Sequence, residues 1–176
     1  MFATIYLPNF YLQAALRYQV PLPKTPVALI DQTDQKAVII QLNSVAECAG
    51  IRKGMTPTQG LARSLNLVVK TRSHSQEKLI EQIVLHYAFT LSPYVEATGP
   101  GLSTVQFTDK RDLLPKLSNV VNQLAACGVV AQSGLAQTPD TSFFAAHLAR
   151  PVLQINDPKK FLDPLPIETL VMGFES

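Results

Sequence analysis

The chain has 176 residues, of which 47% are apolar and 16% charged, a composition that excludes wholesale disorder and supports one domain or two small ones. No apolar run approaches the roughly 18 residues of a spanning helix, so we expect no membrane partner. The net charge of +2 is unevenly distributed. Residues 11–75 hold eight basic and three acidic side chains, whereas acidic side chains outnumber basic ones in the rest of the chain.

Short elements alternate in the first 75 residues. Apolar runs bounded by turn residues predict strands at residues 3–7, 27–30, 37–42 and 67–70. We expect helices at 10–18, from Asn43 or Ser44 to Gly50, and from Thr56-Pro57 onward, where the proline suits a first helical turn. Three prolines within residues 20–26 predict a linker, and the polar residues 31–35 predict a hairpin loop.

The second part of the chain alternates longer helices with strands. Apolar residues at spacings of three and four predict helices at 75–91 and 113–127, and a further helix is expected at 139–149. The predicted strands are 94–98, 103–107, 129–135 and a final edge strand at 152–155.

When residues 11–75 are left out, the predicted elements follow the order strand, helix, two strands, helix, strand. This order predicts an α+β fold, namely a ferredoxin-like βαββαβ unit with helices layered on an antiparallel sheet. Residues 11–75 would then form an inserted, basic α/β subdomain. The excess charge fits a polyanion partner, and a solvated face of ordinary lysines explains it equally well.

Four segments in this order resemble the Y-family (translesion) DNA polymerases, and the likeness runs from about residue 2 to 170. They are residues 5–13 (IYLPNFYLQ), 50–62 (GIRKGMTPTQGLA), 92–96 (SPYVE) and 134–136 (GLA). The resemblance implies a palm at 1–10 and 76–156, fingers at 11–75, and the start of a truncated thumb at 157–176, where residues 165–170 (LPIETL) look like its first part.

The resemblance also implies where a polymerase would hold its metal ions. Two-metal nucleotidyl transfer needs carboxylate oxygens around Mg²⁺. The family's metal-binding positions fall on Tyr6 and on Gly101 and Leu102 (Gly99 or Pro100 if the register slips). We therefore expect no metal, no cofactor and no polymerase activity. The alternative is a divergent, Mg²⁺-dependent nucleotidyltransferase that uses shifted acids such as Glu96, Asp109 or Asp112.

Other implied site residues lie in the fingers segment. The family's nucleotide-contacting positions fall on Tyr11 (or Phe10), Ser44 and Glu47, and Glu47 would repel a triphosphate. Arg52 and Lys53 are candidates for DNA contact, or a solvated pair on a turn. Lys70, Arg72 and His74 alternate at strand spacing and would either follow a phosphate backbone or protect an edge strand.

Leu7-Pro8, next to the Tyr6 position where the family has an aspartate, resembles the first strand of the ImuB-like branch of the family. That branch implies a non-catalytic adaptor in bacterial damage-induced mutagenesis, linking DNA, a separate error-prone polymerase, the sliding clamp and a recombinase-like accessory protein. The branch's clamp-binding region is not expected in this chain. The lone Cys48 and Cys127 and the missing basic start of a signal peptide favour the cytoplasm. A pure protein-interaction domain is the third alternative.

Overall fold

The computed structural model of the protein describes residues 1–17, 24–31 and 37–166. The predicted linker at 20–26 and the predicted loop at 31–35 lie partly outside these residues, and so do residues 167–176, half of the predicted thumb segment. The chain divides into a first unit, Met1–Pro8 with the described residues of Glu81–Ser176, and a second unit, Asn9–Ile80. The assignment of palm, fingers and thumb to these segments stays a prediction. No helix in the described ranges is long and apolar enough to cross a membrane.

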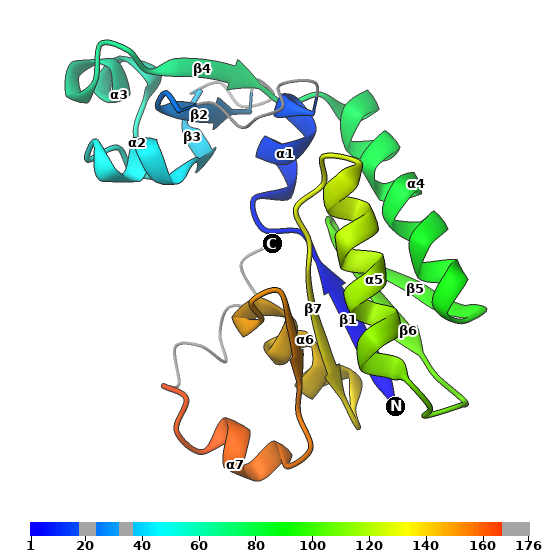
Figure 1. Cartoon of the computed structure of the whole chain (residues 1–176). Coiled ribbons are helices and arrows are strands. Elements are labelled where there is room, and N and C mark those ends of the chain that lie inside the picture. Colours follow the sequence, from blue (N-terminus) through cyan, green and yellow to red (C-terminus); the bar gives the residue numbers. More distant parts are fainter. Residues whose placement is uncertain (18–23, 32–36, 167–176) are drawn as a thin grey trace. The chain divides into compact units, whose positions relative to one another are not determined.

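The helices and strands follow the order expected from the sequence, and most bounds agree within a few residues (Figure 1). Helix α7 was not predicted. In chain order, the elements are β1 (Phe2–Tyr6), α1 (Phe10–Leu16), β2 (Val27–Ile30), β3 (Ile39–Leu42), α2 (Ser44–Cys48), α3 (Pro57–Arg63), β4 (Val68–Thr71), α4 (His74–Leu91), β5 (Tyr94–Gly99), β6 (Leu102–Gln106), α5 (Leu113–Ala126), β7 (Gln132–Ala136), α6 (Pro139–Leu148), β8 (Val152–Gln154) and α7 (Pro158–Leu162).

The first unit is built on a five-stranded sheet in the order β5-β6-β1-β7-β8. The four strands β5, β6, β1 and β7 pair antiparallel in the order of a ferredoxin-like βαββαβ unit, which confirms the predicted α+β fold. The fifth strand, β8, pairs parallel with β7, so the sheet is mixed rather than purely antiparallel. The reason is that α6 serves as the crossover helix between these two neighbouring strands.

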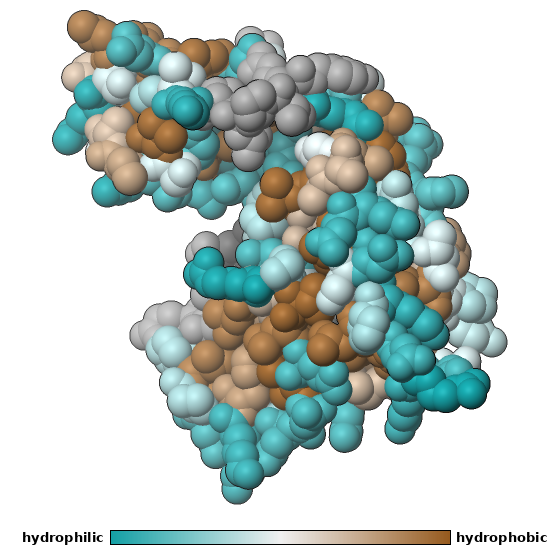
Figure 2. All heavy atoms as spheres, viewed as in Figure 1, coloured by the Kyte–Doolittle hydropathy of each residue, from teal (hydrophilic) through white to brown (hydrophobic). Residues whose placement is uncertain are grey.

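Both faces of the central strand β1 are buried, because Ala3 and Ile5 point to one face and Thr4 to the other. Helices α4 and α5 lie side by side, and the Tyr87 hydroxyl of α4 is 3.4 Å from the Cys127 thiol at the end of α5 (Figure 1). Helix α6 packs on the Thr4 face. In Figure 2, apolar side chains gather over β7 and α6, whereas hydrophilic side chains cover α7.

The contact between α6 and the sheet is unusually close. A Cβ atom added to Gly134 of β7 would lie 2.6 Å from the Ala145 Cβ atom, and nearer still to backbone atoms of Ser142 and Ala146. The buried hydroxyls of Thr4 and Ser142 at this contact are 2.8 Å apart, so each has a partner. Gly134 therefore allows α6 to approach β7 this closely.

The second unit is a three-stranded sheet, β3-β2-β4, with helices on both faces. Strand β2 is fully buried: Val27 and Leu29 contact Leu12 and Leu16 of α1, while Ala28 and Ile30 face a cluster that includes residues of α2. The predicted hairpin of β2 and β3 is confirmed. Asn43 ties these parts together, because its side-chain oxygen accepts hydrogen bonds from the Val27 and Ala46 amides, both at 3.0 Å.

In the second unit, α3 begins at Pro57, as the sequence predicts. Thr56 and Gln59 form a reciprocal capping box at its start, with Pro57 in the first turn. One prediction is wrong: Lys70, Arg72 and His74 do not share one strand face, because β4 ends at Thr71 and His74 begins α4. The Ser-His-Ser sequence here starts a helix rather than continuing the strand.

Candidate functional site

Tyr6, Gly101 and Leu102 lie together in the first unit. Tyr6 ends β1 and pairs directly with Leu102, the first residue of β6. The amide of Leu7 donates to the carbonyl of Gly101 at 2.9 Å, and Gly101 has a positive φ of 69° in the turn before β6. Tyr6 is thus brought from the start of the chain to the other two positions, and all three adjoin at one end of the β1–β6 pair.

The side chain of Tyr6 packs against the imidazole ring of His147 on α6. Its ring stacks on His147 with centroids 3.9 Å apart and planes 23° from parallel, and the centre of the Phe143 ring is 4.3 Å from that of the same imidazole. Burial raises the pKa of the Tyr6 hydroxyl above its usual value of 10.0, so the phenol stays protonated at neutral pH. Burial also lowers the pKa of His147, although a hydrogen bond from its Nδ1 to the Phe143 carbonyl opposes this shift.

The donor set at this point does not fit magnesium. A protonated phenol, a glycine and a leucine supply no carboxylate oxygen, the charged ligand that a two-magnesium centre needs. Within the described ranges, no group of three or more His, Cys, Asp or Glu side chains could hold a metal ion.

The shifted acids Glu96, Asp109 and Asp112 do not come together as a metal-binding cluster. Glu96 is exposed on β5, whereas Asp112 precedes α5. Both carboxylate oxygens of Asp109 accept hydrogen bonds from Arg111, and these bonds lower the pKa of Asp109 to about 2.

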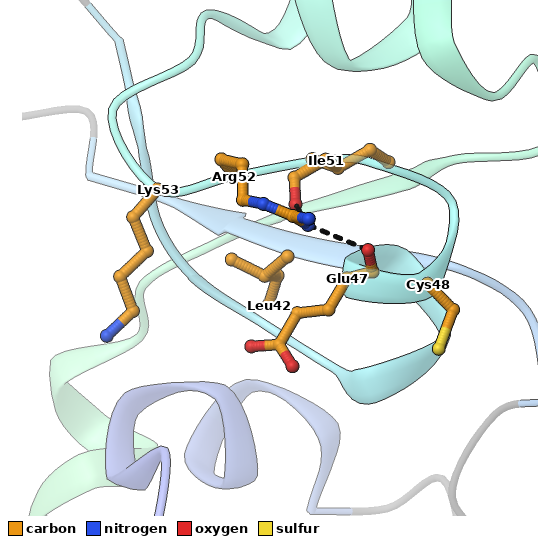
Figure 3. Close-up of a pocket in the computed structure, with 6 residues that line it drawn as sticks. All are labelled: Leu42, Glu47, Cys48, Ile51, Arg52 and Lys53. Carbon is orange, nitrogen blue, oxygen red and sulfur yellow. Dashed lines mark hydrogen bonds between the residues drawn. The ribbon is translucent and has the colours of Figure 1, made fainter.

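A pocket of about 610 Å³ opens in the second unit beside the end of α2 (Figure 3). Three of the predicted site residues line it: Glu47, Arg52 and Lys53. Buried Leu42 and Ile51 form its apolar floor. Nη1 of Arg52 donates to the carbonyls of Glu47 (2.7 Å) and Ile51 (2.9 Å), which fixes the guanidinium over the end of α2. The Lys53 side chain extends toward the same side of the pocket as the Glu47 carboxylate, as Figure 3 shows.

Arg72 is not placed as a surface cation. Its Nε and Nη2 donate to the two carboxylate oxygens of Glu77 at 2.9 and 2.8 Å, and Nη1 donates to Asp31 at 2.8 Å. The guanidinium carbon also lies 4.0 Å above the ring centre of Tyr11. The Arg72 side chain is only 20% exposed. From its place directly after β4, it contacts Tyr11 of α1 and Glu77 in the first turn of α4.

The other predicted positions are dispersed over the second unit. Ser44 is an exposed first residue of α2, and Asn43, not Ser44, caps that helix. Tyr11 is half-buried beneath Arg72, while Phe10 is a core residue at 4% exposure. Lys70 lies on β4, paired with Leu29 of β2.

Sequence reasoning missed the aromatic stack on Tyr6. Phe143 and His147 stand four residues apart on a predicted helix, so their shared face was detectable. That this face meets Tyr6, at the other end of the chain, depends on the packing of α6 and carries no local signal. Cys48, an exposed residue that lines the pocket of the second unit, was also missed.

Comparison with known protein families gives a match that extends over both units. The family model described as "IMS: impB/mucB/samB family" matches residues 5–138. No curated protein matches the sequence.

Several solved structures share the fold at low sequence identity. Dbh DNA polymerase in an insertion ternary complex gives a TM-score of 0.82 at 12% identity, with 96% of this chain and 53% of that chain covered. A Y-family DNA polymerase chimera built on Dbh gives 0.81 at 12% identity, covering 96% and 53%. DinB from Sulfolobus solfataricus gives 0.79 at 12% identity, covering 96% and 52%. The chain thus spans about half the length of these structures.

Proposed function

The chain belongs to the impB/mucB/samB family, and we propose that it is a polymerase-shaped protein that binds DNA without joining nucleotides. Its fold is that of Y-family DNA polymerases, and several of the structures it resembles are described as polymerase complexes. The proposal separates the shape, which the chain keeps, from the nucleotidyl-transfer chemistry, which its residues do not support.

The observation that carries the proposal is the meeting of Tyr6, Gly101 and Leu102 at one end of β1 and β6. Two-metal transfer requires acidic side chains, because the ions must bind both the attacking and the leaving oxygen, and the resemblance implies that these side chains would stand where Tyr6, Gly101 and Leu102 lie. Tyr6 is instead stacked on His147, so its ring packs against α6. The residues are arranged as a packed contact and not as a cation site.

The pocket of the second unit supports the same conclusion. Glu47 places a carboxylate at a position where the resemblance expects a contact to a nucleotide, and a carboxylate disfavours a triphosphate. Arg52, Lys53 and Lys70 are left as the candidates for contact with a phosphate backbone, since Arg72 is engaged by two carboxylates. Such contacts give weak, sequence-independent affinity.

In this proposal the protein is an adaptor in damage-induced mutagenesis, located in the cytoplasm. A separate error-prone polymerase, the sliding clamp and a recombinase-like protein are its proposed partners. The resemblance to the ImuB-like branch supports this role. Because the chain spans about half of the polymerases it resembles, no residue described here is assigned to those partners.

Primer extension with Mg²⁺ or Mn²⁺ tests the catalytic half of the proposal. We expect no nucleotide incorporation under conditions in which an active Y-family polymerase extends the same primer. Incorporation that disappears in Glu96→Ala would overturn the proposal and support a divergent nucleotidyltransferase instead.

Fluorescence anisotropy with labelled primer–template DNA tests the binding half. For about three phosphate contacts, affinity should fall roughly 40-fold between about 50 and 200 mM salt. Lys53→Gln should lower that salt slope by about one contact. The matched control is Lys110→Gln, an exposed lysine of the first unit, which should leave the slope unchanged. If no affinity is found even at low salt, the protein is better described as a protein-interaction domain.

A further inference from the structure

The five-stranded sheet of the first unit leaves part of one face open. Along β6, Ser103 and Val105 are buried on one face, while Thr104 and Gln106 alternate with them on the other and are more exposed. Helix α6 covers this second face over Thr4 and Tyr6, and begins at Pro139. Beyond Pro139 there is a pocket of about 290 Å³ over β5, β6 and the start of β1.

The strand register arranges the side chains of this pocket in rows. Tyr94 of β5, Gln106 of β6 and Phe2 of β1 are direct neighbours across the sheet. Glu96 and Thr104 form the next row. Tyr94 and Phe2 are two strands apart, roughly 9–10 Å, so two aromatic rings border a slot whose floor is an amide side chain.

Tyr94 is exposed, and its backbone is fixed. The residue is 57% exposed although the strand that carries it is hydrogen-bonded to β6. The Tyr94 amide donates to the Ser92 hydroxyl at 3.2 Å, and this hydroxyl donates to the Gln106 carbonyl at 2.6 Å. Since Ser92 is buried at 8% exposure, Tyr94 is held in place without being covered. An exposed aromatic side chain on a rigid backbone loses little entropy when it stacks on a ligand.

We propose that this pocket binds an unpaired nucleobase of a single DNA strand, stacked on Tyr94. A sheet face with exposed aromatic side chains is a platform on which other single-strand-binding domains stack bases. Gln106 and Thr104 offer donors and acceptors to a base edge, and the Glu96 carboxylate disfavours a phosphate. A base, rather than the backbone, therefore faces the pocket. The inference rests on the DNA binding proposed above and adds where one base is held.

Glu96 further predicts which bases are preferred. A carboxylate accepts hydrogen bonds from the amino groups of cytosine and adenine, whereas thymine has no amino group. We expect deoxycytidine strands to bind more tightly than thymidine strands. Glu96→Gln should reduce this preference because an amide can also donate to the thymine carbonyls.

Tryptophan fluorescence tests the site directly, because the chain contains no tryptophan. Tyr94→Trp places a single reporter in the pocket. Phe89→Trp is the matched control, since Phe89 is 55% exposed on α4 in the same unit and does not line the pocket. An unlabelled deoxycytidine strand of about 12 nucleotides, within the usual site size of single-strand-binding domains, should quench the indole emission of Tyr94→Trp in a saturable way. The same strand should leave the emission of Phe89→Trp unchanged. Tyr94→Ala should weaken binding of this strand about 5- to 150-fold.

A second titration with the nucleoside deoxycytidine separates this inference from the proposed function. If the strand binds by anisotropy but does not quench the Tyr94→Trp variant, the base site is wrong and DNA binding stands. If the strand does not bind but deoxycytidine quenches Tyr94→Trp and not Phe89→Trp, the base site stands and the proposed DNA binding falls. Equal quenching of the two variants, or none with either ligand, overturns the base site.

Discussion

Gly134→Ala is expected to destabilise the protein by about 3 kcal/mol or more, a larger effect than that of most single methyl additions. The new Cβ atom would overlap backbone atoms of Ser142 and Ala146, and these cannot rotate away as a side chain can. Helix α6 would have to move off β7, which would break the hydroxyl contact between Thr4 and Ser142. Urea unfolding followed by circular dichroism measures the loss.

Gly99→Ala is the matched control for this substitution. Gly99 lies on the same sheet, and a Cβ atom there would be 3.5 Å from a Leu102 side-chain carbon, an ordinary contact. We expect the free energy of unfolding to change by less than about 1 kcal/mol, with either sign. If both variants were equally stable, the close packing of α6 would not be a determinant of the fold, and the position of His147 over Tyr6 would need another explanation.

The sequence predicts most elements of this fold because their signals are local. The long helix α4 repeats apolar residues every three or four positions, and Thr56, Pro57 and Gln59 mark the start of α3 by their own hydrogen bonds. The direction of β8 is not a local property. A three-residue strand has no pattern that distinguishes parallel from antiparallel pairing, so only the crossover through α6 decides it.

The candidate sites also combine features that are visible in the sequence with features that depend on long-range contacts. The loss of acidic residues at Tyr6, Gly101 and Leu102 is visible in the sequence, and so is the basic charge of residues 11–75. The role of Arg72 is not visible, because one of its carboxylate partners, Asp31, is 41 residues away. An arginine in a basic segment suggests a phosphate contact until the two carboxylates beside it are seen. Long-range pairing, not residue type, decides which cations remain available for a ligand.

Arg72→Ala should lower the free energy of unfolding by about 2–4 kcal/mol at neutral pH. The substitution removes the cation between Asp31, 20% exposed, and Glu77, 9% exposed, and it removes the guanidinium from the Tyr11 ring. The matched control is Arg111→Ala, which breaks a similar two-oxygen contact to Asp109 on the surface, where the arginine side chain is 85% exposed. That variant should unfold at the urea midpoint of the parent protein.

The pH dependence of the Arg72 variant tests the cause of this loss. Hydrogen bonds from Arg72 lower the pKa of Glu77 below its usual value of 4.5, so the unfolded chain binds a proton more readily than the folded one. The ion pair therefore contributes its full stability above about pH 4.5, and this contribution disappears as the pH falls through the lower folded-state pKa. The difference in unfolding free energy between the parent and Arg72→Ala should shrink over that range. A difference that stays constant down to about pH 3, well below the unfolded-state pKa, would mean that Arg72 acts through packing on Tyr11 and not through its carboxylates.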